Sequence, residues 1–278
     1  MSITVGGSVN NTALIALQDL TNTANQLTQA QDVTSTGLQV ASPKDSPAIW
    51  AIAQNQKGEI STLDSVTASL GRATSISDVA IAGGQSVINL LNQLKQTALS
   101  ATDSSLDTTS RQALNSDFQN TLAQITATVN NAGFDGVNLL DGSASTGVNV
   151  LASASGADSL TLSGANLALG GSVITLGSTA SLGSVTAATA AMSQIGTSLA
   201  NLTSALSNLG VQANQIADQT TSVSQLSDSL QTGVGALVNA NMGAESARLQ
   251  ALQVQQQLGA QSLSIANQIP SVILSLFR

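Results

Sequence analysis

The clearest pattern in the chain is a heptad repeat of apolar residues in its C-terminal half. Every seventh residue from Ile195 is apolar, and the row comprises Ile195, Leu202, Leu209, Ile216, Val223, Leu230, Leu237, Ala244, Ala251, Leu258, Ile265 and Val272. This spacing predicts one long helix with a coiled-coil-like seam. Gly233, Gly235 and Gly243 indicate a weak joint in that helix, because glycine costs about 1 kcal/mol in a helix interior. Pro270 is expected to kink or break its last turns.

The N-terminal half shows the same kind of spacing. A first helix is expected to carry one seam with Gln31 and Thr34 as polar members, and its apolar members are Leu17, Leu20, Ala24, Leu27 and Leu38. Pro43 and Pro47 should end this helix and force an extended connector, because proline restricts its own backbone and that of the preceding residue.

Two further helices follow. The seam of the second comprises Leu63, Val66, Leu70, Ala73, Ala80, Val87, Leu91, Leu94 and Ala98, and that of the third comprises Leu114, Phe118, Leu122, Ile125 and Val129. The segment 102–107 between them contains Asp and Ser side chains suited to cap the third helix.

The middle of the chain, about residues 134–184, is rich in Gly and Ser and shows short alternations at Val148/Val150, Leu160/Leu162 and Leu167/Leu169. Such alternation between turn residues predicts short strands. The predicted fold is therefore mainly α: a long antiparallel helical bundle or coiled coil from both termini, with a small β-rich excursion in the middle.

Composition narrows the function. Cysteine and histidine are absent, which removes thiol chemistry, the commonest general base and the commonest metal ligand. No enzyme activity, cofactor or metal is therefore expected. The net charge is −8, with no Lys or Arg between Arg111 and Arg248, so neither nucleic acid nor a membrane surface is an expected partner. No apolar run approaches a membrane span, and the N-terminus lacks the features of a cleavable secretory signal.

Several residues have ordinary structural explanations. Asp45, Asp64 and Asp78 are expected to be solvated or capping carboxylates rather than acid–base groups. The glycines of residues 164–177 lack the lysine of a phosphate loop, so turns explain them better. Trp50 is expected to pack in the connector. The Ser and Thr residues of 143–186 fit O-glycosylation and plain polar loops equally well.

Three stretches carry a resemblance to a known family. LQVASPKDSPAIWAIA at residues 38–53 resembles the N-terminal signature of bacterial flagellins, and NNAGFDGVNLLDG at 130–142 resembles the turn where their helices give way to a β-hairpin. ANQIPSVILSLFR at the C-terminus resembles their final segment. The chain is similar to a short flagellin without large outer domains.

The resemblance implies a domain plan. Residues 1–42 and 236–278 would form a terminal coiled-coil domain that lines the inner tube of a filament. Residues 43–133 and 185–235 would form the helical bundle of the outer tube, and residues 134–184 its β-rich hairpin region.

The resemblance also implies a function and partners. The chain would be a structural subunit that self-assembles into the flagellar filament, a homopolymer that serves motility as a propeller outside the cell. It would be exported by the flagellar type III apparatus and would meet an export chaperone, hook-associated junction proteins and a cap protein. A hook–filament junction protein built on the same plan is the nearest alternative, and the SVILSLFR ending favours the filament subunit.

The two ends are poor in charge, which supports assembly independently. Residues 1–42 carry only Asp19 and Asp32 as charged side chains, and residues 246–278 carry only Arg248 and Arg278. Apolar helices with so little charge would aggregate unless neighbouring copies covered them. The predicted assembly interface comprises Leu17, Leu20, Leu27, Leu38, Leu258, Leu263, Ile265, Ile269, Val272, Ile273, Leu276 and Phe277.

Overall fold

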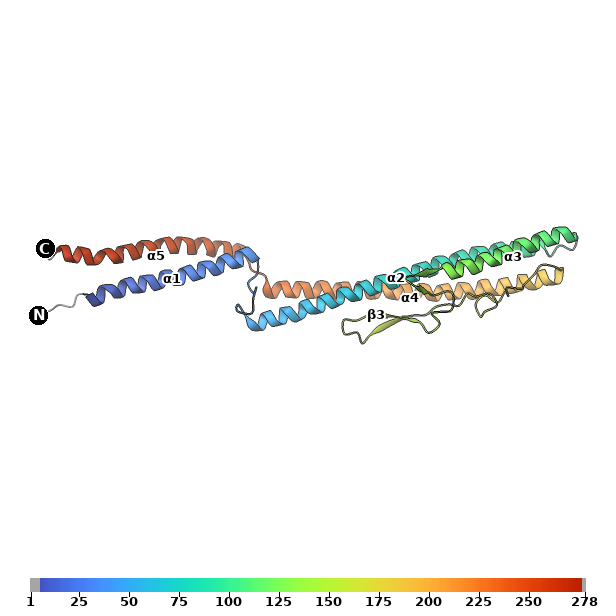
Figure 1. Cartoon of the computed structure of the whole chain (residues 1–278), viewed down its shortest axis with the longest axis horizontal. Coiled ribbons are helices and arrows are strands. Elements are labelled where there is room, and N and C mark those ends of the chain that lie inside the picture. Colours follow the sequence, from blue (N-terminus) through green and yellow to red (C-terminus); the bar gives the residue numbers. More distant parts are fainter. Residues whose placement is uncertain (1–5, 277–278) are drawn as a thin grey trace. The chain divides into compact units, whose positions relative to one another are not determined.

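The computed structural model describes the backbone of residues 6–276 and the side chains of residues 13–267. In chain order the elements are α1 (Gly6–Thr36), α2 (Pro47–Ser100), α3 (Thr108–Asn131), β1 (Gly133–Phe134), β2 (Val137–Asn138), β3 (Val148–Leu151), β4 (Ser159–Leu162), α4 (Val185–Val238) and α5 (Met242–Leu276) (Figure 1). Long helices from both halves of the chain, with a short β-rich stretch between them, confirm the predicted fold class.

The chain divides into two compact units. The terminal unit comprises Met1–Gly58 and Ser229–Arg278, and the bundle unit comprises Glu59–Asp228. The division runs through α2 and α4, so each of these helices contributes residues to both units.

The core of the bundle unit lies along the predicted seams. All nine seam residues of α2 from Leu63 to Ala98 are buried, and so are four of the five of α3, from Phe118 to Val129. In α4 the heptad row is buried from Ile195 to Val223. A Cβ on Gly84 would collide with the Cδ2 atom of Leu206, so glycine at this position lets α2 and α4 approach closely. Full burial of one such large aliphatic side chain is worth about 1.5–3 kcal/mol.

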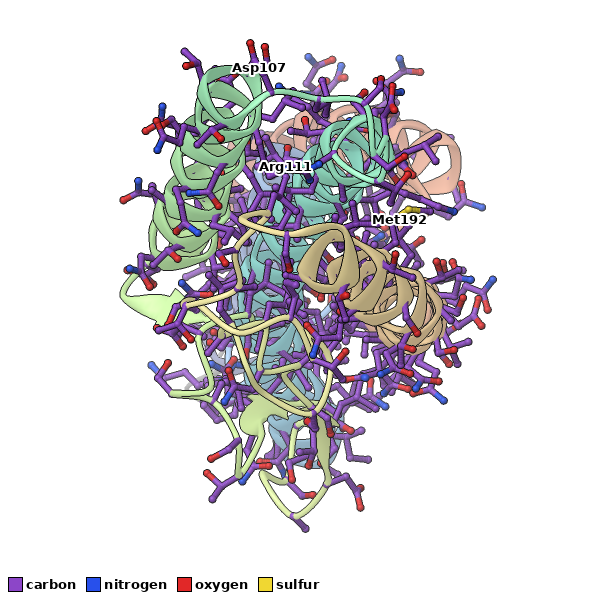
Figure 2. All side chains as sticks on the ribbon, turned by 90° about the vertical axis from the view of Figure 1, so that its right-hand side faces the viewer. Asp107, Arg111 and Met192 are labelled. Atoms are coloured by element: carbon purple, nitrogen blue, oxygen red, sulfur yellow. The ribbon has the colours of Figure 1, made fainter. Side chains whose placement is uncertain are left out.

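The loop between α2 and α3 is held by two side chains. The Asp107 carboxylate accepts a hydrogen bond from the Ser110 N–H at 2.6 Å and caps α3, as the sequence predicts. The same hydrogen bond lowers the pKa of Asp107. Arg111 donates to the carbonyl oxygens of Ala101 at 2.6 Å and Asp103 at 2.9 Å, which closes the loop over the start of α3 (Figure 2).

Two hairpins make up the strands. β1 and β2 are joined through Asp135 and Gly136, whose φ angles of 51° and 77° fit the Asp-Gly turn that two-residue hairpins favour. β3 and β4 pair antiparallel, with Val148 opposite Leu162, which confirms the first two predicted alternations. The third alternation was wrong as a strand, because the Leu167 N–H donates to the Leu140 carbonyl in a loop.

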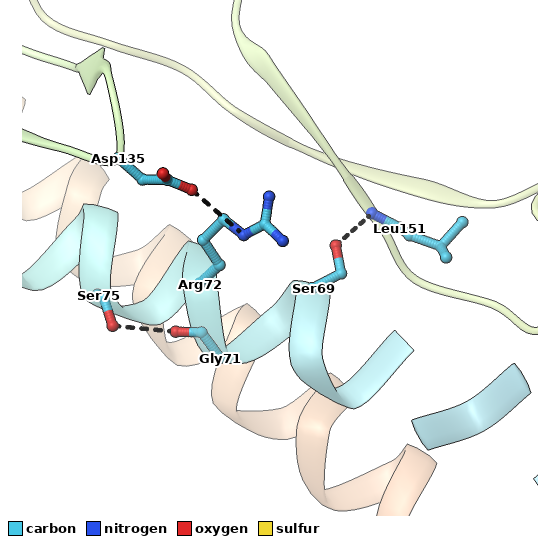
Figure 3. Close-up of polar contacts among 6 residues, drawn as sticks. All are labelled: Ser69, Gly71, Arg72, Ser75, Asp135 and Leu151. Atoms are coloured by element: carbon cyan, nitrogen blue, oxygen red, sulfur yellow. Dashed lines mark hydrogen bonds and ion pairs between the residues drawn. The ribbon is translucent and has the colours of Figure 1, made fainter. Parts of the chain in front are cut away.

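Helix side chains hold the backbone of the β-rich stretch. The Ser69 hydroxyl accepts a hydrogen bond from the Leu151 N–H at 3.3 Å, and the Arg72 guanidinium lies 3.6 Å from the Asp135 carboxylate (Figure 3). Further helix side chains bond backbone groups of this stretch, among them Gln212 with Ser163, Ser198 with Thr175, Asn115 with Leu182 and Gln219 with Ala152. Backbone groups that no strand can satisfy therefore have partners on α2, α3 and α4.

The structure corrects the predicted end of the first helix. α1 ends at Thr36, before the two prolines, because Gly37 takes a φ of +71° and its N–H donates to the Val33 carbonyl. A glycine with positive φ directly after the last helical residue is a common helix terminator. Pro47 instead begins α2, where its missing N–H costs nothing.

The expected joint in the long C-terminal helix lies at residues 239–241. α4 passes unbroken through Gly233 and Gly235, and α5 begins at Met242 and continues through Pro270. Where the chain leaves the helix, Asn239 forms a bridge with Leu38, and the Ala240 N–H donates to the Gly37 carbonyl at 2.9 Å. The Asn241 side chain then accepts a hydrogen bond from the Ala244 N–H at 3.2 Å and caps α5.

Candidate assembly surface

α1 and α5 pack antiparallel along one seam of α5, here called the inner seam. Its members are Glu245, Leu249, Leu252, Gln256, Gly259, Leu263 and Ala266, all buried or half-buried. Leu27 and Ala30 of α1 form a buried cluster with Leu252. Farther along, a Cβ on Gly259 would lie 3.3 Å from the Cδ1 atom of Leu20, so Leu20 packs over this glycine.

A second seam runs along the exposed side of α5, here called the outer seam. Its members are Ala244, Ala247, Ala251, Val254, Leu258, Gln261 and Ile265, spaced alternately by three and four residues and all exposed. Val254, Leu258 and Ile265 are 55%, 59% and 58% exposed. No member of the outer seam is charged, whereas the inner seam includes Glu245, so the outer seam is the more apolar of the two although it stays exposed.

The outer seam includes the part of the predicted heptad row that lies in α5. This row is buried in α4 as far as Val223, and its members from Ala244 to Ile265 are exposed. The row leaves the core before the break at residues 239–241, since Leu230 is half-buried and Leu237 is 38% exposed, both within α4. A seven-residue spacing drifts by about 20° per heptad around a straight helix, so a long row passes gradually from one side of the helix to another.

The N-terminal helix adds apolar surface of its own. Leu14, Ile15 and Leu17 are 60%, 61% and 49% exposed. Grooves of about 470 and 540 Å³ line the α1–α5 pair, and Leu20 contributes to both. The first groove also includes Leu258, so the outer seam borders a hollow that another side chain can fill.

The twelve residues predicted for the assembly interface occupy different environments. Leu17, Leu258 and Ile265 are exposed, Leu20, Leu38 and Leu263 are half-buried, and Leu27 is buried against α5. Leu38 lies outside α1, in the bridge to Asn239. The side chains of Ile269, Val272, Ile273 and Leu276 lie outside the described residues, as does the whole of Phe277.

Sequence reasoning missed two features of this unit. Leu14, Ile15 and Val254 are exposed apolar residues that the predicted heptad rows omit, although a second row offset from the first could have revealed Val254. Glu245 is only 8% exposed, and its carboxylate lies 3.8 Å from Arg248. It sits in the first turn of α5, where the helix dipole favours an acidic group.

Charge is distributed unequally between the units. The terminal unit is neutral by sequence, with Asp19, Asp32, Asp45 and Glu245 balanced by Lys44, Lys57, Arg248 and Arg278. The bundle unit has eleven acidic residues against Arg72, Lys95 and Arg111, and it therefore carries the whole net charge of −8. Within the described residues, no helix is long and apolar enough to cross a membrane.

Comparison with known proteins identifies both ends of the chain. The family model of the bacterial flagellin N-terminal helical region matches residues 8–145, and that of the C-terminal helical region matches residues 192–277. Flagellin FljM of Caulobacter vibrioides is 44% identical over 98% of each chain. The flagellin of Brucella melitensis is 35% identical over 97% of this chain and 98% of its own.

Among solved structures, the crystal structure of Bacillus cereus flagellin is similar with a TM-score of 0.41 and 20% identity, covering 61% of this chain and 88% of that one. The two family models together span most of the sequence, and the reported relatives match over nearly their whole length. These matches favour the filament subunit over the hook–filament junction protein. The chain belongs to the bacterial flagellins, structural subunits that self-assemble into the flagellar filament and so serve motility.

Proposed function

We propose that the terminal unit is the part of this flagellin that drives assembly, with the outer seam of α5 as its main contact with neighbouring copies. The supporting observation is the exposure of that seam. A helix pair that buries Glu245 and half-buries Gln256 while exposing Val254, Leu258 and Ile265 has its more apolar face unpaired. In a filament, other subunits cover that face, and burial of apolar area at about 25 cal/mol per Å² then favours the polymer.

The predicted contact residues fit this role in two ways. Leu17, Leu258 and Ile265 offer exposed side chains for contact between copies. Leu20, Leu27 and Leu263 lie at the contact between α1 and α5 within one copy, so their contribution is to hold the pair together. Ile269, Val272, Ile273, Leu276 and Phe277 extend the predicted interface toward the C-terminus.

The domain plan follows from the same reasoning. Residues 1–42 and 236–278 line the inner tube, residues 43–133 and 185–235 form the outer tube, and residues 134–184 form the hairpin region on it. The neutral charge of the terminal unit supports an inner position, because like charges packed near a filament axis would repel. The protein acts outside the cell after export and has no enzymatic activity, in keeping with the structural family to which it belongs.

The expected partners of the chain are other copies of itself, an export chaperone that covers the apolar terminal helix before assembly, and the junction and cap proteins at the filament ends. Their common requirement is an exposed, uncharged helical face, which the outer seam of α5 supplies.

Substitution of the outer seam tests the proposal. Leu258→Gln combined with Ile265→Gln should abolish seeded filament growth, seen by electron microscopy, and leave the thermal melting of the monomer nearly unchanged. Leu99→Gln is the matched control, since Leu99 is 57% exposed on the bundle unit. Normal filaments from the double variant would overturn the assignment of assembly to this seam.

A further inference from the structure

The two seams of α5 offer α1 a choice that apolar burial alone would decide the other way. Both seams have the alternating spacing of three and four residues that fits a partner helix. The outer seam exposes Val254, Leu258 and Ile265, whereas the inner seam contains Gln256 and Gly259. Hydrophobic stabilisation grows with the apolar area that is buried, so it would favour α1 on the outer seam. Another property of the inner seam must therefore select it.

Two contacts set the register of the α1–α5 pair. Leu27 and Ala30 pack with Leu252. Leu20 packs over Gly259, where a Cβ would lie 3.3 Å from the Leu20 Cδ1 atom and 4.0 Å from the Leu20 Cβ atom. The step from Leu27 to Leu20 and the step from Leu252 to Gly259 are each seven residues, taken in opposite directions along the chain. The two contacts therefore belong to a single antiparallel register.

In this register large side chains lie level with small ones. Leu20 of α1 packs over Gly259 of α5. Four residues farther along each helix, Leu263 of α5 lies level with Ala16 of α1, and both are half-buried. The large residue is on α1 in the first pair and on α5 in the second. Such alternation gives each protruding side chain a hole on the other helix, as coiled-coil packing requires.

The outer seam has no hole for Leu20 at the same level. Its members nearest to Gly259 in the sequence are Leu258 and Gln261, and both have long side chains. With α1 on the outer seam in the same register, Leu20 would meet these side chains instead of a glycine. The small members of the outer seam lie nearer the start of α5 and comprise Ala244, Ala247 and Ala251.

We propose that Gly259 selects the inner seam for α1, because it accommodates Leu20, and thereby keeps the outer seam free for neighbouring copies. If α1 covered the outer seam, the chain would bury within itself the face that the proposed function assigns to assembly. Such a copy could not extend a filament. The inference rests on that proposed function and adds a specificity-determining residue to it. Gly259 is thus a positioning residue that acts through Leu20.

Disulfide formation in the monomer tests the choice of seam. Because the chain contains no cysteine, an introduced pair can form only one disulfide within a chain. Ala30→Cys with Leu252→Cys reports α1 on the inner seam, and Ala30→Cys with Ala247→Cys reports α1 on the outer seam. With glycine at position 259, the first disulfide should form and the second should not. Adding Gly259→Leu should lower the yield of the inner disulfide by about tenfold and raise that of the outer one.

Seeded growth tests the consequence for assembly. Gly259→Leu should raise the critical concentration for growth on intact seeds by about tenfold. The double variant Gly259→Leu plus Leu20→Ala moves the large side chain to the other helix. It should restore both the inner disulfide and the critical concentration to within about threefold of the wild type. Gly58→Leu is the matched control in the same unit, because a Cβ on Gly58 meets no atom within 4 Å, and it should change neither quantity.

The outcomes separate this inference from the function on which it rests. If Gly259→Leu leaves the inner disulfide and growth unchanged, or if the double variant restores neither, Gly259 does not select the seam. Normal growth after transfer of the disulfide to the outer pair would also contradict the inference. The proposed function fails in a different way: Leu258→Gln with Ile265→Gln would then grow normally while the inner disulfide forms as expected.

Discussion

The two units of this flagellin distribute apolar residues in opposite ways. The twelve largest fully buried side chains in the described part of the chain, among them Phe118, Leu91 and Ile174, all lie in the bundle unit. The terminal unit instead exposes Leu14, Leu258 and Ile265 by more than half. The bundle unit therefore completes its core within one chain, whereas the terminal unit leaves a second apolar face exposed, which we propose other copies cover.

Charge follows the same division. The bundle unit carries all of the net charge, a distribution that favours solubility of that unit, and the terminal unit is neutral. A single subunit thus combines a part whose core is complete with a part whose apolar surface stays exposed within one chain. The comparison predicts that changes in the terminal unit affect assembly, and that changes in the bundle unit affect the free energy of unfolding.

Deletion of residues 260–278 should have the largest effect. It removes Leu263, Ile265 and the predicted contacts beyond them, so polymerisation onto intact seeds should be lost. The melting temperature of the monomer by circular dichroism should change little, because the deleted segment lies outside the bundle unit. A large fall in melting temperature would contradict the difference between the two units, since it would mean that residues 260–278 belong to a core within one chain.

Truncation of a buried leucine should show the opposite behaviour. Leu91→Ala removes a side chain with no exposed surface from the bundle core and should lower the free energy of unfolding by about 2–5 kcal/mol. A fragment of about residues 45–235 should be helical, unfold cooperatively and show the same loss. Leu99→Ala in the same helix, at an exposed site, should cost less than about 0.5 kcal/mol. Equal melting of the two variants would mean that the α2 seam is misassigned.

Two buried serines sharpen the description of the bundle core. The Ser77 hydroxyl is fully buried and has no hydrogen-bond partner, so Ser77→Ala should raise the free energy of unfolding by about 1 kcal/mol. Ser198 is equally buried, but its hydroxyl accepts a hydrogen bond from the Thr175 N–H at 3.0 Å. Ser198→Ala should therefore lower the free energy of unfolding by about 1–2 kcal/mol. Denaturant titration of both variants tests whether their effects have opposite signs.

The smallest expected effect is the contribution of Asp107 to stability at low pH. The Ser110 N–H lowers the pKa of Asp107 in the folded chain, so the carboxylate stabilises the bundle fully above its unfolded pKa of about 4. This contribution is lost as the pH falls through the lower folded value. Asp107→Asn keeps a side chain that can cap the helix but removes the titrating carboxylate. The melting temperature of this variant should therefore fall less between pH 5 and pH 2 than that of the wild type. Asp117→Asn is the control, because it removes the same charge from the same helix without changing the cap. If its melting temperature depends on pH as weakly as that of Asp107→Asn, the role of Asp107 is contradicted.

Much of the bundle unit could be predicted from spacing alone. The seams of α2 and α3, the cap at Asp107 and the hairpin strands at Val148–Leu151 and Ser159–Leu162 appear where the sequence places them. Each of these features depends on residues close in sequence or on one continuous helix. The bonds from Asn115, Ser198 and Gln212 to the β-rich stretch could not be predicted, because they join residues far apart in the chain.

The sequence by itself determined that the chain forms long helices, that it contains no cysteine or histidine and that its ends carry apolar stripes with almost no charge. Only the tertiary structure decided which stripe of α5 faces α1. A heptad period shows that stripes exist, but it does not show which of them a partner helix covers. α1 packs against the stripe in which Gly259 leaves room for Leu20, and this choice leaves the more apolar stripe exposed.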